Sequence, residues 1–170
     1  ATFFVLGWVA EQHPGLVRSI RDRGHEVACH GYNHRLIYQM SPEEFRDDTR
    51  RAKTSIEDLI GCEVIGYRAT SFSVISSTLW ALDILAEAGF RYDSSIFPVH
   101  HDRYGLPSAS RFSQIMVRDG HDILEVPPST LSFMSKNIPI AGGGYLRLYP
   151  VRFADWGMRR INDRESQLVI

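Results

Sequence analysis

Two histidines, His30 and His34, stand four residues apart directly after the short apolar segment 26–29. If the chain turns helically there, both imidazoles lie on one face and can reach one divalent cation. The alternative is a pair of partly exposed surface histidines, because this spacing also arises by chance. A catalytic zinc usually has three protein ligands. The pair therefore predicts part of a metal site that needs a third ligand.

Two further polar residues stand where apolar segments end. Arg68 follows 63–67, and Asp93 closes 90–92. In parallel α/β folds the carboxyl ends of strands meet at one edge, and chemistry collects there. Arg68 suits a carboxylate partner in a site, or else a surface salt bridge. Asp93 is a candidate ligand or orienting group, or else a local cap of the following turn. Together with the histidines, these residues predict one site.

The elements that would position these residues alternate between strands and helices. Apolar, β-rich segments predict strands over 2–6, 26–29, 63–67 and 90–95. Helices are expected over 13–25, 41–61 and 76–89. The first strand is uniformly apolar, which is typical of a strand buried on both faces. Long crossovers between strands favour βαβ units, so we expect an α/β fold with a parallel sheet.

The segment 41–61 carries the strongest helix signals. Ser41 and Glu44 fit a capping box, with proline at the first helical position and Gly61 as the stop. Its predicted buried stripe repeats every three or four residues, at Phe45, Thr49, Ala52, Ile56 and Leu59. In the shorter helix over 76–89, Ser77 is the expected cap.

Beyond Asp93 this alternation ends. The segment 98–113 is typical of a loop, and a strand is expected within 122–126, ended by two prolines. A further helix is predicted over 151–163, with Phe153, Trp156 and Ile161 on or near one side.

Composition narrows the classes of function. The chain has 170 residues, 44% hydrophobic and 23% charged, with a net charge of −1. These values are ordinary for a globular domain, and the absence of a basic stripe argues against nucleic acid as a partner. No apolar run approaches the roughly 20 residues that span a bilayer, and no signal-peptide pattern is present. Cys29 and Cys62 predict neither a zinc knuckle nor a disulfide framework, so the compartment stays open.

Other clusters favour simpler interpretations. His100, His101 and Asp102 lie in the loop-like segment, where solvated side chains are the expectation. The glycine-rich stretch 141–145 lacks the residues of a phosphate-binding loop and predicts a tight loop near a groove. No serine lies in a GxSxG nucleophile elbow.

Three motifs in order resemble a known family. HGYNH at 30–34, YRATSFS at 67–73 and YDSSIFP at 92–98 are similar to motifs two, three and four of the NodB-type polysaccharide deacetylases, carbohydrate esterase family four. The sequence at 1–14, 24–36, 90–105 and 141–150 is most similar to the branch associated with exopolysaccharide and exosortase loci of Gram-negative bacteria. The resemblance implies a distorted (β/α) barrel with fewer strands than a TIM barrel. It also implies metal-dependent removal of N- or O-acetyl groups from sugar polymers.

The resemblance also implies roles for individual residues. His30 and His34 would be the metal-binding histidines, Arg68 would orient the catalytic aspartate, and Asp93 would lie in the groove wall. The metal would be divalent, with zinc expected and cobalt or nickel possible, because imidazole suits all three. A polysaccharide or oligosaccharide would be the partner. Apart from the resemblance, exposed aromatic rings near the motifs are candidates to stack on its sugars, and the alternative is ordinary core or rim packing. The aromatic candidates near the motifs are Tyr32, Phe72, Phe97 and Tyr145.

Two family motifs are not found. The aspartate pair that supplies the base and the third metal ligand is expected upstream of Ala1, and the general-acid histidine downstream of Ile170. Residues 1–170 are therefore expected to be the central part of a single deacetylase domain, incomplete at both ends and inactive alone. Two departures concern loop geometry: Gly31 replaces the usual serine or threonine, and Thr70 replaces the usual proline.

Two alternatives remain beside the deacetylase. A related barrel with such a site can be an amidase acting on a small amide, with a closed pocket in place of a long groove. A protein that has lost the aspartate base would be a carbohydrate-binding pseudoenzyme. The sugar polymer, the compartment and the oligomeric state stay open at this stage.

Overall fold

The computed structural model describes residues 1–118, 121–134, 136–165 and 169. Its centre is one six-stranded sheet in the order β1-β2-β3-β4-β6-β5. The strands are β1 Thr2–Val5, β2 Glu26–Cys29, β3 Gly66–Tyr67, β4 Tyr92–Asp93, β5 Gln114–Arg118 and β6 His121–Glu125. All neighbours are parallel except β5, which is antiparallel to β6. The predicted α/β fold with a parallel sheet is confirmed, and the sheet does not close into a barrel within the described residues.

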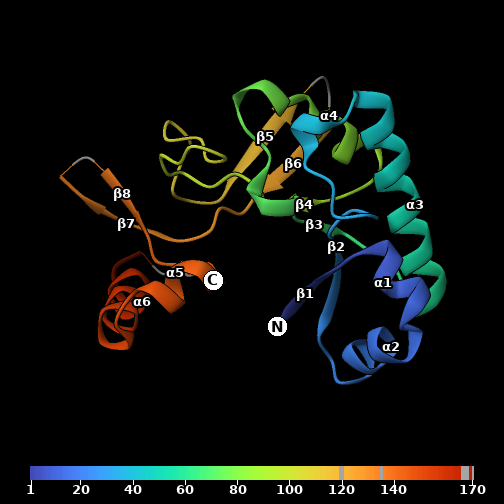
Figure 1. Cartoon of the computed structure of the whole chain (residues 1–170), viewed down its shortest axis with the longest axis horizontal. Helices are drawn as coiled ribbons and strands as arrows, with labels where there is room; N and C mark the ends of the chain where they lie inside the picture. Colours follow the sequence, from blue (N-terminus) through green and yellow to red (C-terminus); the bar gives the residue numbers. More distant parts are fainter. Residues whose placement is uncertain (119–120, 135, 166–168, 170) are drawn as a thin grey trace.

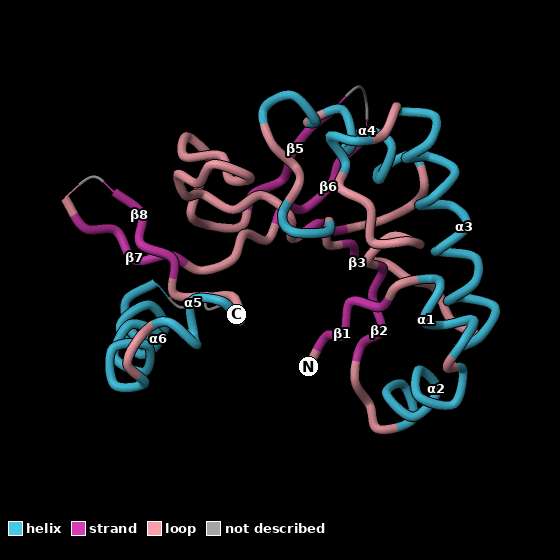
Figure 2. Tube along the Cα trace, in the orientation of Figure 1, coloured by secondary structure: helices cyan, strands magenta, loops and turns pink. Residues whose placement is uncertain are grey.

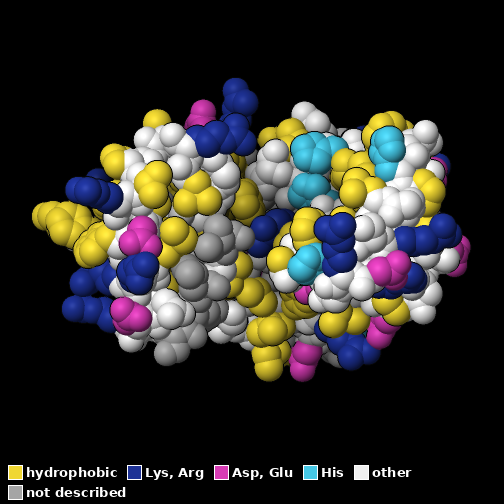
Figure 3. Space-filling view, turned by 90° about the horizontal axis from the view of Figure 1, so that it is seen from below, with side chains coloured by type: hydrophobic (Ala, Val, Ile, Leu, Met, Phe, Trp, Pro, Cys, Tyr) yellow, Lys and Arg dark blue, Asp and Glu magenta, His cyan; other side chains and the backbone are white. Residues whose placement is uncertain are grey.

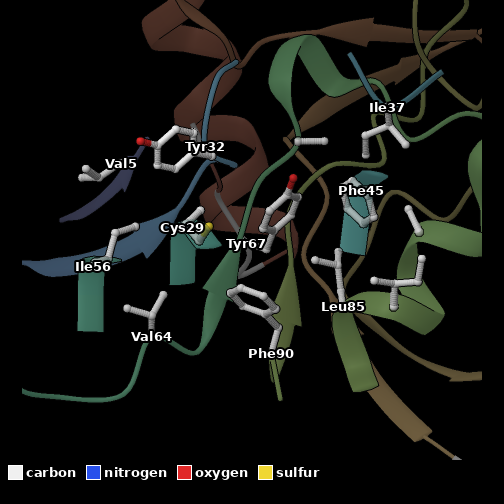
Figure 4. Close-up of a cluster of buried hydrophobic side chains, with 14 of the residues drawn as sticks. Val5, Cys29, Tyr32, Ile37, Phe45, Ile56, Val64, Tyr67, Leu85 and Phe90 are labelled. Carbon is white, nitrogen blue, oxygen red and sulfur yellow. The ribbon is translucent and has the colours of Figure 1, made fainter. Parts of the chain in front are cut away.

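Four helices lie on one side of this sheet (Figure 1). They are α1 Gly7–Gln12, α2 Pro14–Asp22, α3 Pro42–Ile60 and α4 Trp80–Glu87. The 3-10 turns η1 Ile37–Gln39, η2 Thr70–Phe72 and η3 Ser76–Thr78 lie in the connections. The main hydrophobic core joins the helices to the sheet; Figure 4 draws Phe45 of α3 beside Tyr67 of β3 and Leu85 of α4.

The helix α3 forms as its sequence predicts. The Ser41 hydroxyl accepts a hydrogen bond from Glu44 N at 3.2 Å, and the Glu44 carboxylate accepts one from Ser41 N at 2.9 Å. Gly61 ends the helix in the left-handed conformation, with φ 69°. Of the predicted stripe, Phe45, Thr49, Ala52 and Ile56 are buried, and Ile60 joins them in place of Leu59. The cap and stripe together fix the helix against the sheet.

Several local expectations are wrong. The strand β1 is an edge strand of the described sheet, so Phe3 is 41% exposed rather than buried on both faces. The short helix α1 was not expected. Ser77 does not cap α4, because it lies in η3 and the helix begins after Leu79 without a side-chain cap. The strand expected over 63–67 is confined to its last two residues.

The C-terminal part consists of a hairpin and two helices (Figure 2) and has its own small core. A hairpin of β7 Thr130–Phe133 and β8 Lys136–Pro139 precedes α5 Gly143–Leu148 and α6 Val151–Glu165. Leu131, Ile140 and Ile161 form its buried cluster. The predicted helix is confirmed as α6, but Trp156 is 51% exposed and does not share the buried side with Ile161. The glycine-rich stretch starts a helix, α5, rather than a loop.

Two physical properties follow from this arrangement. Both cysteines are free, and burial raises the pKa of the Cys29 thiol to about 12, so it stays protonated as a small apolar side chain. Among the described residues, no helix has the length and apolar character to cross a membrane.

Candidate active site

His30 and His34 lie together at the carboxyl end of β2. Their ring centroids are 5.2 Å apart, with the ring planes inclined at 66°. The backbone N–H of His30 donates to Val5 O at 2.9 Å, which anchors the first histidine to the end of β1. The two rings are therefore neighbours, and their role as ligands of one cation stays a prediction.

The helical turn expected between them is wrong. Gly31 has φ 78° and His34 has φ 58°, so the chain folds back through two left-handed residues instead of a helix. A non-glycine residue in this region is uncommon, and such backbone strain persists where surrounding contacts hold it. The loop, not a helix face, brings the imidazoles together.

His30 is held in one tautomer. Its Nδ1 lies 2.6 Å from the backbone oxygen of Arg68, which can only accept, so Nδ1 carries the proton and Nε2 is left with its lone pair. Burial lowers the pKa of His30, and the nearby His34 and Arg68 lower it further, against the effect of the Arg68 hydrogen bond. A neutral imidazole whose other nitrogen donates to a carbonyl is the form that binds metals. The chemistry of this donor fits a metal ligand.

A carboxylate from α3 supports the loop. Asp48 accepts a hydrogen bond from Tyr32 N at 2.7 Å. A Cβ on Gly31 would lie 3.1 Å from the same carboxylate oxygen and would have to adopt φ 78°. Glycine at this position, a departure from the family pattern, therefore fits the local geometry. Asp48 was missed by the sequence analysis, because its contact depends on the left-handed turn.

Tyr32 was expected to present an exposed ring, but it is buried. Its side chain is 5% exposed, and its hydroxyl donates to Glu11 at 2.6 Å. The guanidinium of Arg51 lies over the ring, 3.6 Å from its centroid. The Tyr32 and Ser55 hydrogen bonds lower the pKa of Glu11. Tyr32 ties the loop to α1 and α3 and offers no face to a sugar.

Arg68 points into a cavity and makes no salt bridge with the described residues. Its Nε donates to Ser94 O at 3.1 Å, and its Nη2 donates to Ser94 Oγ at 2.7 Å. The guanidinium also lies over the Phe4 ring, 4.4 Å from the centroid. Burial lowers the pKa of Arg68, partly offset by nearby acidic groups. The surface salt-bridge alternative is therefore wrong.

The cavity itself has a volume of about 570 Å³ and is lined mainly by side chains of the sheet strands and of the residues that follow them. Phe4 of β1, and Arg68, Ser94 and Val126, which directly follow β3, β4 and β6, are among its lining residues. Figure 3 shows a hollow in one face of the molecule, with basic side chains within it. The backbone oxygen of Arg68 contacts His30 and its side chain enters the cavity, so Arg68 links the histidine loop to the rim of the cavity.

Asp93 lies behind this rim. It is fully buried and accepts hydrogen bonds from Ser95 Oγ at 2.5 Å and Ser95 N at 3.2 Å. These contacts are those of a local cap. Its burial does not support the expected groove-wall position, because no part of the carboxyl group faces solvent.

Glu125 is a site-forming residue that the sequence analysis missed. It is the register partner of Asp93 on β6 and only 2% exposed. Its Oε1 accepts from Ile96 N at 3.0 Å. Burial, and then the charge of Asp93, raise the pKa of Glu125 well above its usual range. The available signal was an acidic residue at a fourth strand end, directly before Val126 and two prolines.

The aromatic candidates divide into two kinds. Phe97 is fully buried, so its expected exposure is wrong; it packs against Phe72 with ring centroids 5.0 Å apart. Phe72 is half-buried and lies under Arg68, whose guanidinium carbon is 5.8 Å from the ring centroid. Tyr145 of α5 is half-buried, and its hydroxyl lies 2.8 Å from that of Tyr104. Only Phe72 and Tyr145 of the original four retain accessible surface near the rim.

The second histidine cluster is the solvated loop that was expected. His101 stacks on Tyr104 with centroids 3.9 Å apart, and Asp102 is 81% exposed. No group of three or more potential metal ligands occurs among the described residues. His30 and His34 therefore remain a pair, without a third protein ligand in this part of the chain.

Known proteins match this chain in two segments. The family model for polysaccharide deacetylase matches residues 1–92, and a Domain of unknown function (DUF3473) matches residues 94–170. Because the first match covers more than half of the chain, the chain belongs to the polysaccharide deacetylase family.

Curated relatives carry related names. The peptidoglycan deacetylase-like protein FGM2 of Gibberella zeae is 33% identical over 95 residues, which cover 56% of this chain and 27% of that protein. The peptidoglycan deacetylase of Helicobacter pylori is 34% identical over 104 residues, covering 60% and 33%. The matched part therefore spans about a third or less of the length of these relatives.

Solved structures share the fold. A protein from Mycobacterium smegmatis assigned as a polysaccharide deacetylase superimposes with a TM-score of 0.65 at 26% identity, over 92% of this chain and 55% of that one. A family 4 carbohydrate esterase from Streptomyces lividans, in complex with acetate, gives 0.50 at 26% identity, over 57% and 50%. PuuE allantoinase gives 0.59 at 21% identity, over 75% and 38%, which concerns the fold alone. The expected fold class is confirmed.

Proposed function

We propose that the protein containing this chain is a metal-dependent hydrolase that removes N-acetyl or O-acetyl groups from a polysaccharide or oligosaccharide. The observation that carries the proposal is the His30 tautomer: Nδ1 faces the Arg68 carbonyl, so Nε2 is the unprotonated nitrogen, and the His34 ring lies 5.2 Å away. Family membership and the names of the relatives give the reaction class.

His30 and His34 are the proposed ligands of a divalent cation, with zinc expected and cobalt or nickel possible. When bound, such a cation polarises a carbonyl and lowers the pKa of water to about 7. The chain's own contribution is to hold His30 neutral through burial and the Arg68 carbonyl. In the family pattern an aspartate pair supplies the third metal ligand and the catalytic base. We assign both roles to such a pair outside the described residues.

Arg68 is the proposed partner of that base. Ser94 engages Nε and Nη2, and Nη1 has no hydrogen-bond partner among the described residues. A guanidinium clamped on one edge and desolvated on an aromatic ring presents its remaining donors in a fixed direction. Phe72, beneath Arg68, and Tyr145 are the proposed contacts for sugar rings.

The organisation of the chain is part of this proposal. We assign residues 1–170 to the central part of one deacetylase domain, because β4 and β6 pair in one sheet across the boundary between the two matched segments. We also propose, from the resemblance given under Sequence analysis, that the protein belongs to the exopolysaccharide-associated bacterial branch. Because the described residues offer two ligand candidates, the polypeptide 1–170 is expected to release no acetate by itself.

The test uses the full-length protein and His30→Gln, His34→Gln and the matched control His121→Gln, an exposed histidine on β6. Bound zinc and acetate release from a chitooligosaccharide are measured for each. Both site variants are expected to lose metal and at least about 100-fold in activity, while the control keeps both.

Unchanged zinc content in both site variants would contradict the proposal. Retained metal and sugar binding in a wild-type protein that releases no acetate would identify the carbohydrate-binding alternative. No observation favours the small-amide amidase, because the allantoinase match concerns the fold alone.

A further inference from the structure

Two acidic side chains lie side by side in the interior beneath Arg68. Asp93 and Glu125 are register partners at the carboxyl ends of β4 and β6, 0% and 2% exposed. Glu125 Oε2 is buried and has no hydrogen-bond partner among the described residues. Two carboxyl groups so placed cannot both be ionised without a large desolvation cost.

We propose that Asp93 and Glu125 share one proton and act together as the positioning unit of Arg68. The role assigned to Arg68 rests on the proposed function, whereas the shared proton does not. A carboxylic acid donating to a neighbouring carboxylate satisfies the Glu125 oxygen that is otherwise left unpaired.

The electrostatics of the interior support a single proton. Burial, followed by the charge of Asp93, raises the pKa of Glu125, and burial raises the pKa of Asp93 against the hydrogen bonds that it accepts. The charged and titratable groups facing the pair are Arg68 and Tyr67, and burial keeps Tyr67 neutral by raising its pKa. Asp93 accepts hydrogen bonds at both carboxyl oxygens, whereas Glu125 Oε2 accepts none from the described residues, so we place the proton on Glu125, which leaves one negative charge to balance Arg68.

The pair controls the backbone segment that seats Arg68. Glu125 Oε1 accepts from Ile96 N, and Asp93 accepts from both donors of Ser95. The Ser95 hydroxyl in turn accepts from Ala69 N at 2.7 Å, next to Arg68 in the chain.

Between these anchors lies Ser94, the residue that binds the guanidinium. Its hydroxyl donates to Val126 O at 2.6 Å, so its lone pairs are turned toward Arg68. On one side of Ser94 lies Asp93, a member of the acid pair. On the other side lies Ser95, which is hydrogen-bonded to Asp93. A change in the acid pair is therefore expected to displace Ser94, and through Ser94 the guanidinium of Arg68.

The test compares Glu125→Gln and Glu125→Ala in the full-length protein with the exposed control Glu63→Gln. Glutamine replaces the shared O–H by an N–H donor and keeps one negative charge on the pair. Its kcat is expected to stay within about 3-fold of wild type. Alanine removes the donor to Asp93 and the acceptor for Ile96 N, and kcat is expected to fall about 100-fold with little change in KM, because a misplaced guanidinium affects the reacting group and not sugar binding.

A second readout does not depend on activity. Because the native pKa of the pair lies above the unfolded value, the native state binds the extra proton, and stability falls as pH rises from about 4.5 through the native pKa. Glu125→Gln is expected to reduce the slope of stability against pH by the contribution of one bound proton. It is also expected to abolish the infrared carbonyl band of a buried protonated carboxyl group at neutral pH. The pH dependence of stability and the infrared band still test the proposal if Glu125→Ala does not fold or the wild type releases no acetate.

Either of two results overturns the proposal. One is a Glu125→Gln protein with the wild-type pH slope and infrared band, which would show that no proton is shared. The other is a glutamine variant as impaired in kcat as alanine, which would show that the donor on residue 125 is not what seats Arg68.

Discussion

The parallel-sheet part and the C-terminal part of this molecule are stabilised in different ways. The first joins four helices to the sheet through a large continuous core, while the second rests on Leu131, Ile140 and Ile161. Large apolar side chains of the second part face outward: Phe133 is 63% exposed and Met134 82%. The candidate active site draws its histidines and Arg68 from the first part, where packing holds backbone positions firmly.

Polar contacts connect the two parts. Asn137 Nδ2 donates to Pro98 O at 2.7 Å, and the hydroxyls of Tyr104 and Tyr145 meet at 2.8 Å. Arg111 reaches Glu165 and the carbonyl of Thr130. The contacts all involve the loop 98–113, so this loop couples the hairpin and helices to the rim of the site.

The largest expected difference between the two parts is in their response to a lost aromatic ring. Phe45 is fully buried between Tyr67 and Trp80, so Phe45→Ala should lower the free energy of unfolding by about 3–5 kcal/mol. Phe133→Ala, at an exposed ring, should change it by less than about 0.5 kcal/mol. Urea denaturation of the full-length protein measures both, and equal losses would contradict the comparison.

A smaller difference is expected at two glycines. Gly31→Ala places a side chain at φ 78° beside Asp48, and should cost about 1–2 kcal/mol and reduce zinc content, because the histidine loop must shift. Gly144→Ala, in the open first turn of α5, should stabilise by about 0.5–1 kcal/mol. Thermal unfolding and metal analysis check this pair. Full zinc content in Gly31→Ala would show that the loop tolerates the change.

The smallest expected effect separates two serines. Ser41→Ala removes a working capping box and should destabilise by about 1 kcal/mol. Ser77→Ala should be within about 0.5 kcal/mol of wild type, because Ser77 caps no helix. A loss at Ser77 as large as that at Ser41 would mean that the sequence-based cap assignment was correct after all.

Regular local signals made much of the fold predictable. The capping box at Ser41, the stripe led by Phe45 and the stop at Gly61 placed α3 correctly, and the alternation of elements gave the parallel order. The hairpin of β7 and β8 and the helix α5 were missed, because their sequences carry neither a strict period nor a cap.

The site was predictable in its members and not in its geometry. His30, His34 and Arg68 share a rim because strand ends meet at one edge of a sheet, which residue order alone indicates. The left-handed His34 and the burial of Phe97 and Tyr32 depend on tertiary contacts that no local pattern encodes. Glu125 was missed because its meaning lies in its pairing with Asp93 across neighbouring strands.

The most direct test of the central claim is X-ray absorption of the zinc-loaded full-length protein, which counts imidazole ligands. The account predicts two imidazole nitrogens at about 2.0–2.1 Å in the wild type. It predicts two in His121→Gln as well, and one in His34→Gln when excess zinc compensates for the weaker metal binding of that variant. A wild-type spectrum without imidazole, or a count unchanged by His34→Gln, would contradict it.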